Sequence, residues 1–413
     1  MPNAQTIPSD QTTPSAQAAS PAQAASPAVS VIIPIYNVER WIERAVRSIQ
    51  DQTFHDWELW LVDDGSTDGS GAICDRLAAT DARIQAIHQE NAGAAAARNA
   101  ALDRARGTYV YFMDGDDWCE PEMLQDMTAA AQRHGLDLLV CGFYIDTYLN
   151  DNDFYQELRT APDAVYTNRH AFRAHAHELF DAQLLYAPWN KLYRRAYLDE
   201  HAIRFPSTFW DDLPFNLAVV ANVENVGCLP RRYYHFLRAR AESENTKYRP
   251  DMRPKREDEH LWLCQLYRLW GFASVLAPPS SDENLAGSPF GSDVFAPDKP
   301  AEASTDYLEQ RRDQIEEFLA RRYSERLVGC IENVTNPNCT LTTAQRRAAV
   351  EEMLSQPHAK AAFRLARPNS SYMKLMMAPL RAGNVTAALA EGSVISWVRT
   401  HDTNLFARLK ANR

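Results

Sequence analysis

The sequence has no run of 18 or more apolar residues, so nothing in its 413 residues predicts a membrane-spanning helix. It also lacks two glycine-rich signatures of nucleotide binding. There is no G-x-x-x-x-G-K-[ST], and no G-x-G-x-x-G follows a strand. A P-loop site and a Rossmann dinucleotide site therefore lack their phosphate cradle, and a bound phosphate would need a metal ion instead.

Basic residues are outnumbered by acidic ones, and cysteines are few. The chain has 43 Lys and Arg against 54 Asp and Glu, and this net charge of −11 argues against general nucleic-acid binding. Its seven cysteines are odd in number and form no C-x-x-C pair, which predicts single structural thiols in a reducing compartment. Residues 1–28 hold no Lys or Arg and no apolar core, unlike a signal peptide. We therefore expect a cytoplasmic protein.

Three regions differ in composition. Residues 1–28 are mainly Ala, Gln, Ser, Pro and Thr and are predicted to be disordered, because they offer little apolar surface to bury. Residues 29–250 form the main predicted domain. Residues 251–413 are predicted to be mostly helical, with a flexible stretch at 277–304 that is rich in Pro, Ser, Gly and Asp.

Strands and helices alternate between residues 29 and 145, which predicts a doubly wound α/β sheet. The continuous apolar run at 29–35 is typical of a strand buried on both faces. Apolar residues then recur at helical spacing from Val38 to Ile49. Further strands are predicted at 57–62, 84–88, 108–113 and 136–145. Helices are predicted to about residue 79, over 94–105 and over 120–134.

Polar segments follow three of these strands. The first strand ends in Pro-Ile-Tyr-Asn at 34–37, the second in Asp-Asp at 63–64, and the fourth in Asp-Gly-Asp-Asp at 114–117. Ligands of an open α/β sheet bind beyond the carboxyl ends of its strands, so up to five carboxylates would gather at one edge. A divalent cation would offset their repulsion and hold a diphosphate. Ordinary acidic turns are the alternative for each segment taken alone.

Four segments stand in the order and spacing seen in family 2 glycosyltransferases: VSVIIPIYNVERWI, LVDDGSTDGS, NAGAAAARNAAL and YFMDGDDW. The resemblance covers residues 29–145 and continues through PWNKLYRRAYL at 188–198 and FWDDLPFN at 209–216. It implies the GT-A fold, a doubly wound mixed sheet with nucleotide-sugar binding at 29–145 and an acceptor side at 146–250. It also implies an inverting transferase of bacterial polysaccharide synthesis, with a UDP-sugar donor and a saccharide or lipid-linked acceptor.

The resemblance also implies roles for individual donor-site residues. In the first three segments the matching positions are Pro34, Ile35, Tyr36, Asp64, Gly93 and Arg98. The first three would form the floor for the base, and Asp64 would hydrogen-bond it. Gly93 and Arg98 would lie beside the nucleotide. For Arg98 the open alternative is a structural pair with an aspartate.

The fourth segment resembles the family's D-x-D motif. Asp114 and Gly115 would face the donor, and Asp116 with Asp114 would ligate Mn²⁺ or Mg²⁺. Asp117 is interpreted as structural. His235 is left out of the metal set, because a lone histidine is more often structural.

The acceptor side would supply the base, because a sugar hydroxyl is a poor nucleophile until its proton is removed. In the family this base lies in an acidic pair downstream of the D-x-D, which points to Asp212 beside Asp211. The alternative is an acidic first turn of a helix. Trp189 and Trp210 would stack on acceptor sugars, or else pack in the core.

Several alternatives stay open at this stage. A nucleotidyltransferase would share the sheet and the carboxylates, and a non-catalytic sugar-nucleotide binder would share the whole site. Arg238 and Arg240 either close over the diphosphate or are solvated. The segment 364–413 carries eight Lys or Arg against two acids. It either touches an anionic membrane from the inner face of the cell or packs as terminal helices.

Overall fold

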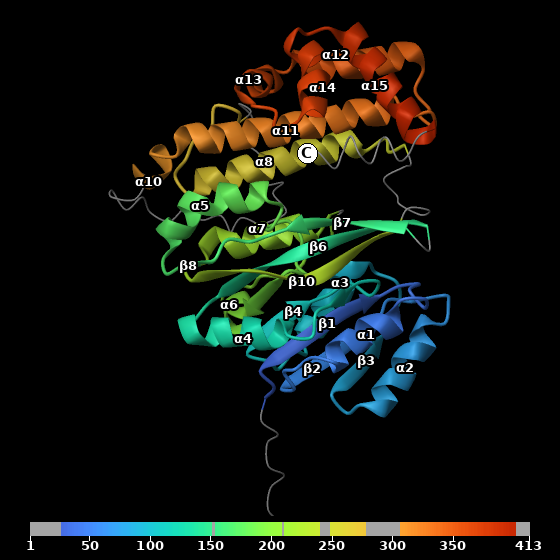
Figure 1. Ribbon diagram of the computed structural model, residues 1–413, viewed down its shortest axis with the longest axis vertical. Helices are drawn as coiled ribbons and strands as arrows, with labels where there is room; N and C mark the ends of the chain where they lie inside the picture. The colour runs from blue at the N-terminus through green and yellow to red at the C-terminus, as the bar shows by residue number, and fades with distance from the viewer. Residues whose placement is uncertain (1–25, 151–152, 209, 240–247, 278–305, 402–413) are drawn as a thin grey trace, which may run out of the picture.

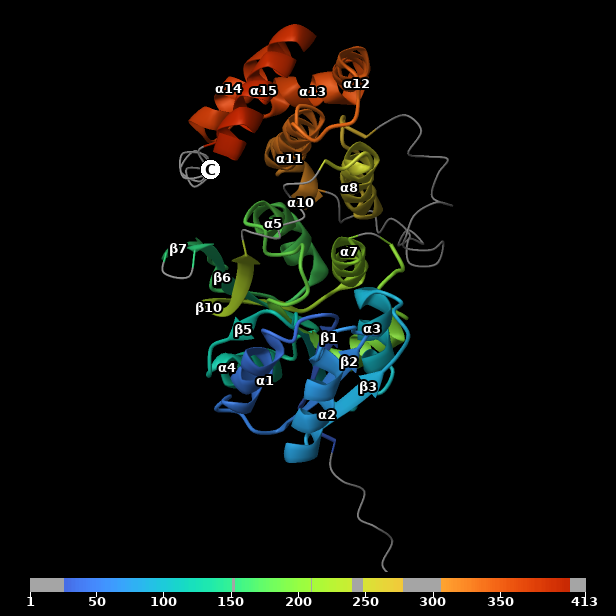
Figure 2. The same ribbon diagram turned by 90° about the vertical axis from the view of Figure 1, so that its right-hand side faces the viewer.

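The computed structural model describes residues 26–150, 153–208, 210–239, 248–277 and 306–401. Two stacked parts are visible in Figure 1: a twisted sheet with helices on both faces, and a layer of helices formed by the C-terminal third of the chain. Figure 2 shows that α5 and α7 lie between the sheet and the long helices α8 and α11 of this layer. The helical layer therefore covers one face of the sheet part.

The strands are β1 (Val29–Ile35), β2 (Trp57–Asp63), β3 (Ile84–His88), β4 (Tyr109–Phe112), β5 (Trp118–Cys119), β6 (Leu138–Asn150), β7 (Asp153–Arg159), β8 (Ala164–Tyr166), β9 (Lys191–Arg194) and β10 (Val226–Ala239). The helices of the sheet part are α1 (Ile42–Gln50), α2 (Ser70–Thr80), α3 (Ala94–Leu102), α4 (Met123–His134), α5 (Arg169–Asp181), α6 (Arg195–Glu200) and α7 (Asp212–Asn222). Those of the helical layer are α8 (Met252–Leu269), α10 (Asp306–Glu309), α11 (Arg312–Val334), α12 (Thr343–Ser355), α13 (Pro357–Leu365), α14 (Ser371–Arg381) and α15 (Val385–His401).

The sheet is mixed, as predicted. Its strand order is β3-β2-β1-β4-β9-β6-β10-β5, with β7 added beside β6 and β8 beside β10. Strands β1 to β4 are parallel, whereas β9 runs antiparallel to both β4 and β6. The long strands β6 and β10 are again parallel to each other. Strand β9 therefore joins the predicted parallel half to a second half, of which the alternation pattern predicts only β6.

Apolar spacing explains the local structure of the first half. Six of the seven residues of β1 are fully buried, as expected for a strand covered on both faces. Helix α1 buries Ile42, Ala45, Val46 and Ile49. These are the apolar positions that the helical spacing predicts, apart from Val38, which lies before the helix. Strand β6 runs five residues past the predicted end at Ile145, because β7 and β10 pair with its outer part. All seven cysteines are buried and unpaired, as predicted.

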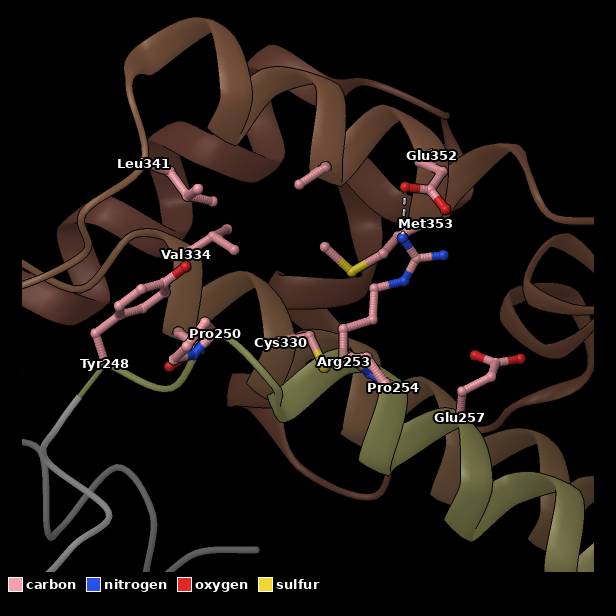
Figure 3. Close-up of a pocket in the computed structure, with 12 residues that line it drawn as sticks. Tyr248, Pro250, Arg253, Pro254, Glu257, Cys330, Val334, Leu341, Glu352 and Met353 are labelled. Carbon is pink, nitrogen blue, oxygen red and sulfur yellow. Dashed lines mark ion pairs between the residues drawn. The ribbon is translucent and has the colours of Figure 1, made fainter. Parts of the chain in front are cut away.

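Helices α8, α11 and α12 border a cavity of about 450 Å³ inside the helical layer (Figure 3). Its lining residues all belong to 248–353, so the sheet part contributes none of them. Val334, Leu341 and Met353 give it an apolar wall. Arg253 of α8 points across it toward Glu352, with which it forms an ion pair at 2.9 Å.

The low-complexity N-terminal segment, the flexible stretch and the basic tail lie only partly within the described residues. Residues 1–25 of the low-complexity segment, residues 278–304 of the flexible stretch and residues 402–413 of the tail lie outside the described residues. The carbonyl of Pro27 already accepts a hydrogen bond from Thr108 N–H, so the ordered sheet begins just before residue 29. In the tail, α14 buries Met373, Met376 and Met377 among its neighbours. No described helix is both long enough and apolar enough to cross a bilayer.

Candidate active site

Three loops at the carboxyl ends of β1, β2 and β4 meet at one edge of the sheet. Strand β1 pairs in parallel with β2 on one side and β4 on the other. Hydrogen bonds tie the first two loops together: Asn37 Oδ1 accepts from Thr67 N–H at 2.8 Å, and Ser70 Oγ accepts from Val38 N–H at 2.9 Å. The strand order therefore puts the acidic segments after β2 and β4 at the same edge, flanking the end of β1.

Asp64 organises the loop that follows β3. Its side chain is buried, and Oδ1 accepts from Gln89 Nε2 at 2.7 Å and from Ala92 N–H at 2.9 Å. Oδ2 accepts from Gly93 N–H at 2.8 Å. Gly93 has a φ of +89°, which glycine adopts at little cost, and it stands directly before α3. Both carboxylate oxygens thus shape the loop beside the predicted nucleotide site, and contact with the base stays a prediction.

The end of β1 lies close to the D-x-D loop. A Cβ atom on Gly115 would come within 3.0 Å of Ile35 Cδ1 and 3.3 Å of the Pro34 carbonyl oxygen, so only glycine fits there without a shift. Ile35 is buried, whereas Tyr36 is 49% exposed. The predicted floor for the base therefore offers one open aromatic side chain, Tyr36, next to the D-x-D loop.

Arg98 joins acids of the predicted donor side to those of the predicted acceptor side. It projects from α3 and is buried. Nη2 donates to Asp114 Oδ1 at 2.8 Å, Nη1 donates to Asp211 Oδ2 at 2.9 Å, and Nη1 lies 3.2 Å from Asp212 Oδ1. Burial lowers the pKa of the guanidinium, but the three carboxylates outweigh burial and raise this pKa above its ordinary value. The arginine–aspartate pair considered from the sequence is present, but as a cluster in which three acids share the arginine.

Asp116 differs from Asp114 in its ion pairing: Asp114 pairs with Arg98, whereas the Asp116 carboxylate forms no ion pair within the described part of the chain. Arg44 approaches, but it donates to the main-chain carbonyl of Asp116 at 2.6 Å. Burial, followed by the charge of Asp114, raises the pKa of the Asp116 carboxyl to about 6. The nearby charge of Arg44 opposes this rise only in part.

A divalent cation would offset the repulsion between the Asp114 and Asp116 carboxylates. Mg²⁺ and Mn²⁺ commonly take one or two carboxylates and complete their shell with phosphate oxygens and water. Within the described ranges, no group of three or more His, Cys, Asp or Glu side chains could hold a metal by itself. The donor set of Asp116 and Asp114 is therefore suited to a cation shared with a bound diphosphate.

Asp212 occupies the first turn of α7, directly after Asp211. Its side chain is about one-third exposed, while Oδ1 turns inward toward Arg98. Burial is the largest influence and raises the pKa of Asp212 to about 7, with Asp211 adding to the rise and Arg98 opposing it. The acidic pair thus begins a helix. A pKa near 7 would suit a general base near neutral pH, and this role of Asp212 stays a prediction.

The two tryptophans of the acceptor side differ. Trp189 is only 6% exposed, and its ring stacks on Tyr234 at 4.5 Å between centroids and 9° between planes. This is the core packing named as its alternative. Trp210 has a φ of +63° and lies under the guanidinium of Arg256, whose carbon is 4.1 Å from the ring centre. A residue of the helical layer thus covers the loop before the acidic pair.

Asp117 serves the sheet itself. Its side chain is fully buried, Oδ1 accepts from Leu237 N–H at 2.7 Å, and Oδ2 accepts from the Tyr234 hydroxyl. The same hydroxyl accepts from Asp114 N–H at 3.2 Å. The interpretation of Asp117 as structural fits these contacts, which anchor the D-x-D loop to β10.

His235 is fully engaged by acids. Nδ1 lies 2.8 Å from Asp146 Oδ2 and Nε2 lies 3.0 Å from Glu120 Oε1, so neither nitrogen is left for a metal. Arg238 forms an ion pair with Glu157 of β7 at 3.1 Å. Arg240 lies outside the described residues.

Sequence reasoning gave no role to Lys191 or Arg256. Lys191 is completely buried, and Nζ donates to the carbonyls of Leu184 and Ala187 and to Asn190 Oδ1. Burial lowers the pKa of its amine to about 7. Lys191 begins β9 inside the PWNK segment, directly before the apolar Leu192 and Tyr193. This position could have predicted a buried lysine that holds the preceding loop by hydrogen bonds. The sequence holds no comparable signal for Arg256, which lies far along the chain from Trp210.

The family model described as "Glycosyl transferase family 2" matches residues 30–202. The chain is 37% identical over 237 residues to the uncharacterized glycosyltransferase EpsJ of Bacillus subtilis. The matched region covers 56% of this chain and 66% of EpsJ. It is 36% identical over 182 residues to the putative glycosyltransferase EpsH of the same organism, covering 43% of this chain and 50% of EpsH. The chain therefore spans between half and two thirds of these relatives' lengths.

A solved structure shares the fold. S. aureus TarS 1–349 in complex with UDP-GlcNAc superposes with a TM-score of 0.55 at 21% sequence identity, covering 88% of this chain and 90% of that one. The superposition extends well past residue 202. The likeness in fold therefore takes in more than the part that the family model matches.

Proposed function

We propose that this chain, whose residues 30–202 match the family 2 glycosyltransferase model, transfers a sugar from a nucleotide-sugar donor to a saccharide or lipid-linked acceptor with inversion at the anomeric carbon. The observation that carries the proposal is the Arg98 cluster, in which one buried guanidinium pairs with Asp114 of the D-x-D and with Asp211. The acid of the donor side and the candidate base, Asp212, therefore lie around one arginine. That is the proximity that a single displacement requires.

The chemistry follows from these positions. Asp116 and Asp114 would hold Mn²⁺ or Mg²⁺, which when bound supplies neutralising charge for the departing nucleoside diphosphate. Asp212 takes the proton of the acceptor hydroxyl as its oxygen bonds to the anomeric carbon. The bond from that carbon to the diphosphate breaks on the opposite face, so one displacement inverts the configuration. Arg98 keeps Asp212 oriented and its neighbouring acids compensated.

Relatives support the finer part of the proposal. TarS binds UDP-GlcNAc in its solved complex, which favours a UDP-hexose or UDP-N-acetylhexosamine donor here. A further relative, 47% identical over 98 residues, is the putative teichuronic acid biosynthesis glycosyltransferase TuaG of Bacillus subtilis. We therefore propose hexosyl transfer in the assembly of a bacterial surface polysaccharide. Peripheral membrane contact through the basic tail belongs to the same proposal, with Trp397 of α15, 59% exposed, as its apolar anchor.

A donor screen tests the function. The full chain is incubated with a panel of nucleotide sugars and Mn²⁺ or Mg²⁺, and we expect hydrolysis of one donor class that stops on addition of EDTA. Asp212→Asn should still bind that donor but transfer its sugar about 10²–10⁴-fold more slowly. Asp199→Asn, an exposed acid paired with Arg195, is the matched control and should behave as the native chain.

Three outcomes would contradict the proposal. Release of pyrophosphate from a nucleoside triphosphate plus a sugar phosphate would identify a nucleotidyltransferase. Donor binding without hydrolysis or transfer for any sugar would identify a binding protein. Full transfer by Asp212→Asn would remove the assigned base.

A further inference from the structure

Arginines of the helical layer reach the acceptor side of the sheet part. Arg256 of α8 lies over Trp210, which stands two residues before Asp212. Arg326 of α11 has its guanidinium carbon 6.0 Å from the centre of the Tyr186 ring. Figure 2 shows α8 above α7, the helix that Asp212 begins, with α11 beside α8 and above α5. Positive charge of the helical layer therefore lies close to the proposed acceptor site.

Tyr186 itself is tied to α7. Its main-chain carbonyl accepts from Asn216 Nδ2 at 3.1 Å, and its hydroxyl accepts from Arg322 Nε at 3.2 Å. Arg322 is compensated by Glu325 at 3.1 Å. The loop that carries Tyr186 is thus fixed between α7 and α11, which sets the position of the nearby arginines relative to α7.

Arg256 and Arg326 share one carboxylate. Arg256 Nη1 and Arg326 Nη2 each lie 2.7 Å from an oxygen of Glu259. Within the described ranges of the chain, neither arginine forms an ion pair with a second acid. Burial raises the pKa of Glu259, but Arg326 and Arg256 outweigh it and hold this pKa at about 2, so the acid stays charged. Two positive charges and one negative charge leave this trio with a net charge of +1.

The trio is accessible to a ligand. The side chains of Arg256 and Arg326 are 23% and 25% exposed, whereas that of Glu259 is 4% exposed. Partly buried guanidinium groups bind phosphate with two parallel hydrogen bonds, and the low local dielectric strengthens them. Trp210 lies directly against Arg256, so a sugar attached to a phosphate bound there would lie near the loop that precedes Asp212.

We propose that Arg256 and Arg326 bind a phosphate group of the acceptor, so that this enzyme acts on a phosphate-bearing saccharide rather than on a neutral one. The proposal rests on the glycosyl transfer proposed above. Phosphate bound between the two arginines would neutralise their residual charge and place an attached sugar beside Trp210, close to Asp212. The phosphate belongs either to a lipid diphosphate carrier or to a soluble sugar phosphate.

Direct binding tests this site without relying on turnover. Three probes are titrated into the full chain by calorimetry: decyl diphosphate N-acetylglucosamine, N-acetylglucosamine 1-phosphate and neutral decyl N-acetylglucosaminide. EDTA is present so that no cation recruits phosphate to the donor site. We expect at least one anionic probe to bind about tenfold or more tightly than the neutral one. Arg256→Gln and Arg326→Gln should each weaken that binding about tenfold and leave the neutral probe unchanged.

Matched variants separate a binding role from a structural one. Arg256→Lys keeps the charge and should recover part of the affinity. Arg253→Gln changes the same residue type one turn earlier on α8, where the side chain faces Glu352 across the cavity (Figure 3). It should bind all probes as the native chain does.

Each remaining outcome decides the question. A preference for the diphosphate lipid or for the sugar phosphate names the source of the phosphate, and either supports the site. Equal affinity for neutral and anionic probes, no binding of either anionic probe, or an equal loss in Arg253→Gln overturns it. Donor hydrolysis with Mn²⁺ is followed in the same variants. If no donor is hydrolysed by the native chain, the proposed transfer fails, while the calorimetric result still decides the phosphate site.

Discussion

Replacing Arg98 with glutamine removes the cation that three carboxylates share. The Arg98 side chain is only 5% exposed, and its guanidinium lies 2.8, 2.9 and 3.2 Å from Asp114, Asp211 and Asp212. Removing one partner of a buried ion pair costs about 3–5 kcal/mol. The three acids keep 18–34% of their side-chain exposure, so water relieves part of the strain. We therefore expect a loss of stability of about 2–4 kcal/mol at neutral pH.

The loss should grow as the pH rises. Burial already raises the pKa values of Asp211 and Asp212, and Arg98 lowers them. Without Arg98 these pKa values rise further in the folded state but not in the unfolded one. An acid whose folded pKa is raised loses stability as the pH climbs from its unfolded value through its folded value. The gap between native and variant should therefore widen from pH 5 to pH 8, on either side of the native pKa of about 7 for Asp212.

Thermal unfolding at pH 5, 6.5 and 8, followed by circular dichroism without metal, measures this gap. Arg204→Gln is the control. Arg204 also pairs with two aspartates, Asp103 and Asp199, at 3.0 Å, but its side chain is 34% exposed. Exposed pairs contribute about 0–1 kcal/mol, with little dependence on pH in this range. If Arg98→Gln lowers the midpoint no more than Arg204→Gln, or by the same amount at every pH, the reasoning about the cluster is wrong.

Four further results are expected. The kcat/KM of transfer should follow a single ionisation near pH 7, falling about tenfold by pH 6, because Asp212 must be ionised to act as base; a flat profile from pH 6 to 8 would contradict this. Mn²⁺ affinity, measured by calorimetry, should fall steeply below pH 6 as Asp116 takes up a proton. If Asp116→Asn bound the donor as tightly as the native chain does, the metal site would be rejected. Gly115→Ala should raise the donor KM several-fold, because its Cβ would come within 3.0 Å of Ile35. An unaltered KM would show that the D-x-D loop can shift to accept the methyl group. Trp397→Ala should weaken sedimentation with anionic vesicles; equal sedimentation would discard membrane contact.

The first half of the fold could be predicted because its signals are local. Apolar runs, helical spacing and acidic segments at strand ends are all read within about ten residues, and β1 to β4 appear where these signals put them. Strand β9 has four residues, and its place between β4 and β6 depends on contacts across the sheet. The extension of β6 to Asn150 likewise depends on pairing with β7 and β10. Non-local pairing of this kind leaves no period in the sequence.

The candidate site shows the same division. Motif order predicts roles for Asp114, Asp116 and Asp212, and the structure puts the first two in the loop after β4 and the third at the start of α7. It allows Arg98 one partner aspartate but does not show that three acids share this arginine, because Arg98 meets Asp211 over 113 positions of the chain. Trp189 shows the opposite error of inference. An aromatic residue beside a motif invites a sugar-stacking role, but its 6% exposure is decided by Tyr234, which belongs to a distant strand.

For Arg98, a structural role and a functional role do not exclude each other. An arginine that paired with one aspartate would be a structural tie and nothing more. Arg98 instead faces three acids that motif order assigns to two different tasks, and each of them lies within 3.2 Å of the same guanidinium. Because the charges are this close, no one of the acids can change its protonation state or its partner without altering the electrostatic energy of the other two. The arrangement that stabilises the fold therefore also couples the predicted donor side to the predicted acceptor side.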